Sequence, residues 1–350
     1  FFFWSQEWRR ERVPSSFNLT VPYSAERSGD FSDLCLPTPG PDCPTDPRTS
    51  KPFDGTMGPL PVDPAAAALL PHIPVGTVDV PGASSYIANV TLPTSWREEL
   101  VRVDHNINSK NRVTFRYIHD SWNTIEPGPI WDSASFPTVQ TAFNGPGVSV
   151  VARLTSNISP SLLNEFVASY TTDHISFKSV GYYQRPANFP MGYIFNNGAG
   201  GKLPAINLSG GIYDGIAEDP NGIWPEGPYN SNPTYTYRDN LTKIAGRHNL
   251  TFGAYFVAGQ KNELSSVQVN GSLTFDKGSS ISSGNPFADM LLGNIASFSQ
   301  GSNQLKFYNR YKILEPYFQD DWRVTDRLTL NLGVRDRKST RLNSSHRCIS

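Results

Sequence analysis

The residues able to do acid–base chemistry or to bind a metal are scattered through this sequence. Zinc sites on helices use a His-Glu-x-x-His spacing, and the sequence contains none. The histidines lie far apart, at His72, His105, His119, His174, His248 and His346. His105 and His248 stand beside expected turns, which favours a place at the rim of a sheet over a role as metal ligands. We therefore expect no catalytic residue, no cofactor-binding residue and no metal ligand.

Two pairs of adjacent acids, Glu98-Glu99 and Asp320-Asp321, have the residue type that a glycosidase needs. Adjacent residues on a strand point to opposite faces, so neither pair can converge on one sugar. Asn197–Lys202 has the look of a phosphate loop, but Leu203 replaces the required Ser or Thr and no strand–helix context surrounds it. A Gly-x-Ser-x-Gly elbow is also lacking, so we expect that the protein is not an enzyme.

Cys35 and Cys43 stand eight residues apart in a proline-rich segment. A local disulfide forms readily at such a spacing in an oxidising compartment. The alternative is two unpaired cysteines in a loop. No Cys-x-x-Cys pair supports a zinc ribbon or a redox motif.

The composition favours a protein built of strands and irregular connections. Charged residues make up 17% and aromatic residues 12%, with 28 glycines and 29 prolines. Aromatic side chains suit pleated sheets, and Gly and Pro suit turns. The formal net charge of −1 gives no field that would steer the chain to nucleic acid. The apolar stretch Ala65–Leu70 is bounded by prolines and is too short for a membrane-spanning helix, which needs about 18 residues.

Several segments alternate between apolar and polar residues, as half-buried strands do. The clearest is Leu328–Arg335, where Leu328, Leu330, Leu332 and Val334 would share one face. The others are Arg112–Tyr117, Val148–Thr155 and Asn249–Ala258. Only the segment around Pro286–Leu292 has a helical pattern.

The connections between these segments are of two kinds. Four are short and polar, as in hairpins: Asn108–Asn111, Ser159–Ser161, Ala245–Arg247 and Thr325–Arg327. Three are long and rich in Gly, Pro and Asn: Asn123–Gly147, Ser176–Asn232 and Lys261–Asn294. Short turns at one end and long loops at the other are the layout of outer-membrane barrels. In hydrocarbon every backbone polar group must be paired, so only helices and closed barrels span a membrane.

Six motifs resemble the barrel of Oar-like TonB-dependent receptors, in the order of that family. They are FFFWSQEWR (Phe1–Arg9), VPYSAERSGDFS (Val21–Ser32), VRVDHNINSKNR (Val101–Arg112), DNLTKIAGRHNLTFG (Asp239–Gly253), PFADMLLG (Pro286–Gly293), and YFQDDWRVT with LTLNLGVR (Tyr317–Thr325 and Leu328–Arg335). The resemblance implies an all-β fold: part of a transmembrane antiparallel β-barrel, an open curved sheet with long loops. It implies location in the outer membrane of a Gram-negative bacterium.

The same resemblance implies a function. Such a receptor takes up a ligand, here unknown, with energy supplied by the TonB complex of the inner membrane. Its partners are that complex and outer-membrane lipid, and no nucleic acid is expected. We expect the plug and the TonB-binding segment to precede Phe1 and later strands to follow. The alternative is an extracellular β-rich binding module, such as a carbohydrate-binding or adhesin domain, whose apolar residues would point into a shared core.

The two ends of the chain have different expected origins. Residues 1–336 are expected to be the N-terminal part of the receptor barrel, starting after a signal peptide that this sequence lacks. Residues 337–350, RKSTRLNSSHRCIS, break the strand pattern and resemble a translated sequencing adapter. We expect this tail, with Cys348, to be non-native; the alternative is a genuine disordered terminus.

Overall fold

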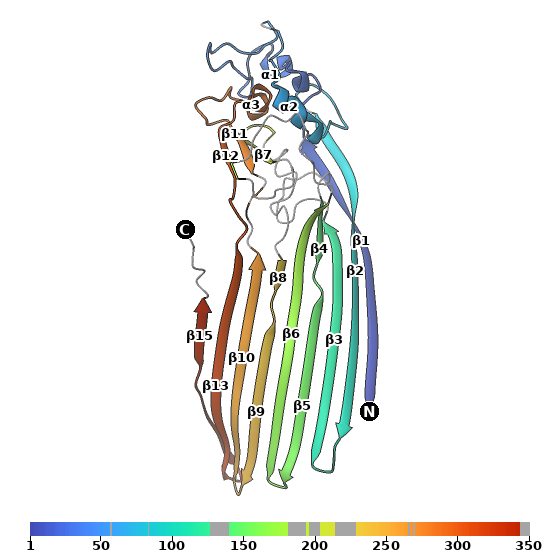
Figure 1. Ribbon diagram of the computed structural model, residues 1–350, viewed down its shortest axis with the longest axis vertical. Helices are drawn as coiled ribbons and strands as arrows, with labels where there is room; N and C mark the ends of the chain where they lie inside the picture. Colours follow the sequence, from blue (N-terminus) through green and yellow to red (C-terminus); the bar gives the residue numbers. More distant parts are fainter. Residues whose placement is uncertain are drawn as a thin grey trace.

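The computed structural model describes residues 1–56, 58–82, 84–126, 140–180, 194–195, 204–213, 229–264, 267, 269 and 271–343. A tall antiparallel sheet of twelve strands stands below a compact group of short helices and a three-stranded sheet (Figure 1). Among these described residues no helix is long and apolar enough to cross a membrane.

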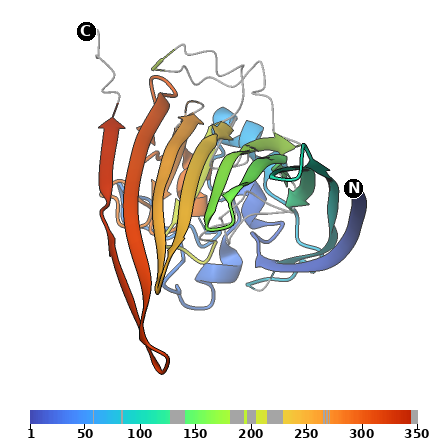
Figure 2. The same cartoon turned by 90° about the horizontal axis from the view of Figure 1, so that it is seen from below.

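The large sheet is antiparallel throughout. Its strands are β1 (Phe2–Thr20), β2 (Ser85–Asn106), β3 (Asn111–Glu126), β4 (Gln140–Asn144), β5 (Gly147–Ser159), β6 (Leu162–Val180), β8 (Tyr229–Ser231), β9 (Thr234–Ala245), β10 (His248–Leu264), β13 (Lys306–Thr325), β14 (Leu328–Arg335) and β15 (Lys338–Asn343). Their order follows the chain, and the pairs β4/β5, β8/β9 and β14/β15 each share one position. The sheet is open, with β1 at one edge and β14 with β15 at the other, and Figure 2 shows it curving between them. The predicted strand at Leu328–Arg335 is confirmed with the same bounds.

The four predicted hairpins join β2 to β3, β5 to β6, β9 to β10 and β13 to β14, all at one end of the sheet (Figure 1). In the first of them, the Asn108 side-chain oxygen accepts from the backbone N–H groups of Lys110 and Asn111, each at 2.9 Å. Gly246 takes a positive φ of 62° in the β9–β10 turn, a conformation that favours glycine. The described ends of the long connections lie at the opposite end of the sheet, as predicted.

The long connections, however, are not simply loops. Parts of them assemble with residues 21–84 into a folded unit at the top of Figure 1, which we call the cap: residues 21–84, 204–213 and 271–299. The three-stranded sheet is here, made of β7 (Ala205–Ser209), β11 (Ser272–Asp276) and β12 (Ser297–Ser299). β7 and β11 pair in parallel, in this small sheet and outside the antiparallel barrel sheet.

The cap also holds the buried core of the described chain. Its fully buried side chains come from segments far apart in sequence: Val21, Phe31, Leu60, Leu69, Ile73, Ile206, Leu208, Leu273, Phe275, Phe287, Met290 and Leu291. Burial of this many apolar side chains is the main stabilising term for such a small unit. The predicted disulfide between Cys35 and Cys43 is confirmed and lies in the same core.

Three α-helices lie in the cap: α1 (Ser32–Cys35), α2 (Pro64–Leu69) and α3 (Pro286–Leu292), with 3-10 turns at Glu26–Ser28 and Leu70–His72. The prediction of α3 is confirmed, but the prediction of a single helix is wrong. Helix α2 has a clear sequence signal, since Asp63 caps it by accepting from Ala65 N at 2.7 Å and Pro64 occupies its first turn.

The C-terminal segment does not leave the sheet at residue 337. After a break at residues 336–337, β15 pairs with β13 from Lys338 opposite Leu314 to Asn343 opposite Asn309. Within the described chain, the strand structure is therefore interrupted only at residues 336 and 337. Residues 344–350 lie outside the described residues, and the non-native origin of the tail stays a prediction.

Candidate functional site

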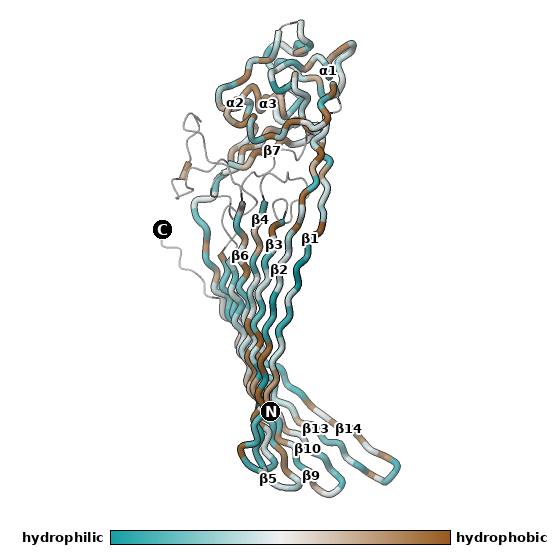
Figure 3. The backbone as a smooth tube through the Cα atoms, turned by 90° about the vertical axis from the view of Figure 1, so that its right-hand side faces the viewer, coloured by the Kyte–Doolittle hydropathy of each residue, from teal (hydrophilic) through white to brown (hydrophobic). Residues whose placement is uncertain are grey.

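The large sheet has two faces of different chemistry. In a strand successive side chains point to opposite faces, and in an antiparallel pair directly opposed residues share a face. On β10 one face carries Leu250, Phe252, Ala254 and Phe256, and the other carries Asn249, Thr251 and Tyr255. We call these the outer and inner faces of the sheet. Figure 3 shows apolar and polar stretches alternating along the strands.

The outer face carries a band of mostly apolar side chains, which we call the apolar band. Register places Leu241 of β9 and Phe318 of β13 on either side of Phe252, whose ring lies 4.9 Å from that of Phe318. Other apolar residues share the outer face in neighbouring registered rows: Val103, Phe115, Leu154, Phe166, Leu314, Leu330 and Leu332. Phe252 is 47% exposed although β10 has neighbours on both sides. A sandwich would bury such a face in a shared core, whereas a barrel wall presents it to lipid.

The inner face carries ion clusters instead. Asp104, only 8% exposed, accepts from Arg102 Nε at 2.8 Å, from Arg112 Nη2 at 3.0 Å and from the Thr114 hydroxyl at 2.7 Å. These residues come from β2 and β3 and share the inner face. The carboxylate fixes two guanidinium groups that remain about half exposed.

Two further clusters repeat this arrangement of one carboxylate between two arginines. Glu165 lies 2.7 Å from Arg238 and 3.7 Å from Arg153, joining β6, β9 and β5. Glu315 pairs with Arg335 and lies 3.2 Å from Arg337, with the carboxylate 11% exposed. We call the three groups the arginine triads. Each has a local charge of +1 and presents oriented, partly exposed donors on the inner face, which suits hydrogen bonding to an anionic or polar surface.

Two glycines of β10 allow aromatic rings to lie flat on the inner face. A methyl group at Gly253 or Gly259 would overlap the ring of Tyr317 or Tyr311 on β13. The Tyr317 hydroxyl donates to Asn240 Oδ1, and the Arg335 guanidinium lies 5.6 Å from the centre of the Tyr317 ring. The ring thus connects β9, β10, β13 and β14, and one arginine triad packs on it. Cross-strand packing of aromatic rings over glycine is a device of curved sheets.

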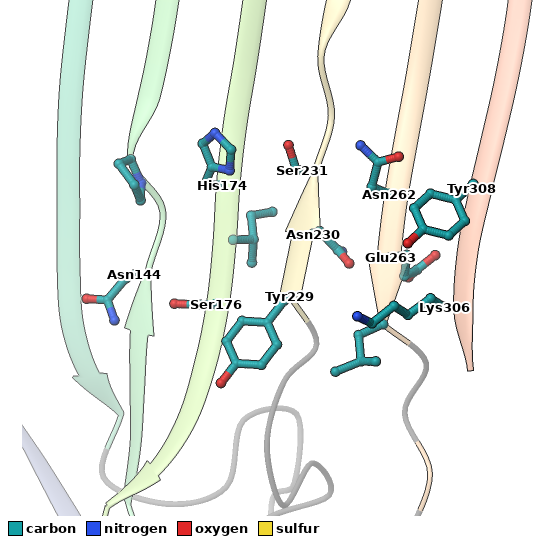
Figure 4. Close-up of a pocket in the computed structure, with 13 residues that line it drawn as sticks. Asn144, His174, Ser176, Tyr229, Asn230, Ser231, Asn262, Glu263, Lys306 and Tyr308 are labelled. Carbon is teal, nitrogen blue, oxygen red and sulfur yellow. The ribbon is translucent and has the colours of Figure 1, made fainter. Parts of the chain in front are cut away.

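A pocket of about 400 Å³ lies where the sheet approaches the cap (Figure 4). We call it the rim pocket. It is lined by Asn144, Pro146, His174, Ile175, Ser176, Tyr229, Asn230, Ser231, Asn262, Glu263, Leu264, Lys306 and Tyr308. Most of these side chains are polar and neutral. The sequence pattern did not predict that these residues lie close together, because β8 is a short strand inside a predicted loop.

The cap contains a buried carboxyl group. Glu26 is 0% exposed; its Oε2 accepts from Tyr23 N at 2.8 Å and from the Tyr213 hydroxyl, and its Oε1 has no partner. Burial raises the pKa of Glu26 to about 7, and the nearby Asp33 acts in the same direction. Burial and the facing Glu26 also raise the pKa of Tyr213. The contact ties residues 204–213 to the N-terminal part of the cap.

The five histidines within the described residues lie in different parts of the structure. His119 lies 3.3 Å from Glu99, and His248 bonds Asp320 at 2.7 Å and stacks on Trp322. His174 lines the rim pocket, while His72 lies half-buried in the cap and His105 is exposed near a hairpin. His346 lies outside the described residues. In the part of the chain that the structure describes, no group of three His, Cys, Asp or Glu residues could hold a metal ion.

The two acid pairs also lie as expected. Asp320 shares the outer face with His248, whereas Asp321 accepts from Gln319 Nε2 at 3.1 Å on the inner face. Glu99 accepts from Gln6 Nε2 at 3.1 Å on the face opposite to that of Glu98. Neither pair forms a two-carboxylate site. The segment 197–202 lies outside the described residues.

An antiparallel sheet that is apolar outside, polar inside and turned by hairpins at one end is a section of an outer-membrane barrel wall. The sequence agrees: residues 1–349 match the outer membrane beta barrel domain family, and the chain belongs to that family. It lies in the outer membrane of a Gram-negative bacterium.

Comparisons with individual proteins add two solved structures. The outer membrane transporter YddB from Escherichia coli aligns with 76% of this chain and 29% of its own, at 11% identity and a TM-score of 0.39. FpvA of P. aeruginosa, in complex with a heterologous pyoverdine and iron, aligns with 72% of this chain and 31% of its own, at 15% identity and a TM-score of 0.39. The chain thus spans less than a third of either. No curated protein matches the sequence.

Proposed function

We propose that this chain is part of an Oar-like TonB-dependent receptor that imports a ligand across the outer membrane. The observation that carries the proposal is the inner face, where three arginine triads lie on the side of the sheet opposite to the apolar band. A narrow barrel fills its interior with its own side chains, whereas a wide one leaves a polar lumen. Oriented guanidinium groups along such a wall suit contact with a plug domain or a polar ligand.

The position of the cap fits this function, because the cap is a folded unit at the end of the barrel wall that a ligand would reach first. It lies at the end of the sheet opposite the hairpins, which is the extracellular end in outer-membrane barrels (Figure 1). A ligand would meet the cap first and the inner wall next. Energy must come from the inner membrane, so the proposal includes a TonB-binding segment and a plug in the part of the receptor that precedes these strands.

An extracellular binding module is the second candidate, and the exposed apolar band speaks against it. Phe252 is 47% exposed on the apolar face of β10 instead of packed into a shared core. No observation on the described residues favours an adhesin or a carbohydrate-binding domain.

Uptake by cells expressing the full-length gene tests the proposal. We expect accumulation of the ligand to stop when TonB is deleted or the proton gradient is collapsed. Ligand binding at the cell surface should persist under both treatments, because recognition at the mouth requires no energy. Uptake that continues unchanged without TonB would make the protein a passive pore and overturn the proposal.

A further inference from the structure

One strand of the barrel wall has a basic stripe on its lipid side. Along the outer face of β13, Lys306, Tyr308, Arg310 and Lys312 alternate with inner-face residues, and the apolar band begins at Leu314. The order runs from the cap end of the strand toward the hairpin end (Figure 1). The three cations therefore stand directly above the apolar band, on its extracellular side.

A pair of tyrosines lies in the same registered row on the neighbouring strands. Tyr170 of β6 and Tyr235 of β9 are opposed on the outer face, with ring centres 5.0 Å apart. Tyr235 is in turn opposite Ala258 of β10, which is opposite Lys312. Tyr side chains gather where hydrocarbon meets the headgroups.

The rim pocket adjoins this surface on the side nearer the cap. Its outer-face residues form one registered row of His174, Ser231, Asn262 and Tyr308, followed by a second containing Ser176, Tyr229, Leu264 and Lys306. Figure 4 shows His174, Ser231 and Asn262 from three neighbouring strands above Tyr229, Tyr308 and Lys306. Hydroxyl, amide and imidazole groups in such rows can hydrogen-bond a sugar or a phosphate.

The cations of the stripe have no acidic partner among the described residues. Lys306 and Lys312 lie in none of the ion pairs of the described chain, and Arg310 donates only to neutral acceptors, Asn262 Oδ1 at 2.7 Å and Asn309 O at 2.8 Å. Glu263, the one acid among the described residues that line the pocket, has inner-face parity and lies 2.9 Å from Lys261. The arginine triads of the inner face, in contrast, each contain a carboxylate. The stripe is thus a positively charged surface whose charge no acid of the described chain balances, so it can bind an external anion.

We infer that the rim pocket and the basic stripe together bind the phosphorylated headgroup of a glycolipid in the outer leaflet, with Lys306, Arg310 and Lys312 on its phosphates and the pocket on its sugars. The acyl chains would then lie along the apolar band beside Leu314 and Phe256. The charges match, since the extracellular leaflet of this membrane consists of phosphorylated lipopolysaccharide. Basic clusters at headgroup depth are the usual form of such recognition. This site faces away from the lumen and is independent of TonB-dependent uptake.

Binding of lipid A to the purified full-length receptor in detergent tests the inference. The probes are bisphosphorylated lipid A, dephosphorylated lipid A and inorganic phosphate, followed by microscale thermophoresis at two salt concentrations. We expect wild type to prefer the bisphosphorylated form, and the variant Lys306→Gln/Lys312→Gln to bind it at least tenfold more weakly. Added salt should weaken wild-type binding more than variant binding, because two charges have been removed.

Matched variants keep the result interpretable. Lys261→Gln removes a lysine at the same level of the inner face and should leave binding unchanged. Lys306→Arg/Lys312→Arg keeps the charges and should retain affinity within threefold. Equal binding by wild type and the Gln variant, equal loss in Lys261→Gln, or equal affinity for dephosphorylated lipid A would overturn the inference. Competition by inorganic phosphate at equal concentration would assign the site to free phosphate and overturn the lipid assignment.

Discussion

Adjacent residues of one strand meet different surroundings in this protein, as Thr251 and Phe252 illustrate. Phe252 packs on Phe318 in the lipid-facing band, while Thr251 lies opposite Thr242 and Gln319 on the inner face. Phe252→Arg should cost about 2–4 kcal/mol of folding free energy near the midplane, because a charge then enters hydrocarbon. Thr251→Arg should cost less than about 1 kcal/mol. Urea titrations of the full-length protein in lipid vesicles measure both, and equal costs would contradict the face assignment.

Glu26 gives the cap a dependence on pH. The pKa of the Glu26 carboxyl is about 7 in the folded cap, against its ordinary value of 4.5, which applies to the unfolded chain. A carboxyl whose folded pKa is raised favours the folded state below its unfolded pKa, and this advantage is lost as the pH rises from about 4.5 to about 7. The loss should reach about 3 kcal/mol. Hydrogen exchange of residues 204–213 should therefore accelerate across this window.

The variant Glu26→Gln provides the control for that prediction. Its amide cannot ionise, so exchange in residues 204–213 should stay constant between pH 5 and pH 8 after correction for intrinsic rates. A wild type that shows no more pH dependence than Glu26→Gln would contradict a buried, neutral Glu26.

At the scale of elements, β10 and β13 depend on each other through glycine and tyrosine. Gly253→Ala places a methyl group where the Tyr317 ring lies, so we expect a destabilisation of about 1–3 kcal/mol from overpacking. Tyr317→Ala removes the ring, and Gly253→Ala in that background should cost much less. A double-mutant cycle measured by urea unfolding gives the coupling. Additive costs would show that the ring does not lie over Gly253 in the folded protein.

The elements that sequence predicts are those fixed by local pattern. Alternation marks β14 and much of β3, β5 and β10, and turn residues such as Asn108 and Gly246 mark the hairpins. The cap lacks such a signal, because its core joins residues 21–73 to residues 206–291 and each contributing segment is short. Helix α2 is the exception, since Asp63-Pro64 is a recognisable helix start that sequence analysis overlooked.

The candidate sites divide in the same way. The arginine triads follow from strand parity once the register is known, because Asp104, Arg102 and Arg112 all fall on the inner face. Register itself depends on pairing across up to a hundred residues, as between β1 and β2, and cannot be read from one strand. Predicting the rim pocket from sequence would also require placing the short strand β8. Predicting the buried site of Glu26 would require its contact with Tyr213, nearly two hundred residues away.

At the scale of the whole molecule, the structure is a section of barrel wall with a folded cap at its extracellular end. The open edges at β1 and at β14 with β15 expose unpaired backbone groups, which hydrocarbon does not tolerate. In the membrane these edges must be covered by further strands, so stability measurements belong on the full-length receptor. The wall then has lipid on its apolar band and water or a plug against the arginine triads.

Site-directed spin labelling along β10 tests this assignment of faces most directly. Single cysteines at positions 250 to 258 of the full-length receptor, in lipid vesicles, would be labelled and measured for collision with oxygen and with a water-soluble nickel chelate. We predict that positions 250, 252, 254, 256 and 258 are accessible to oxygen, and that the alternate positions are shielded from oxygen and reached, where open, by the nickel chelate. Absence of a two-residue period, or a period with the opposite phase, would contradict the barrel wall described here.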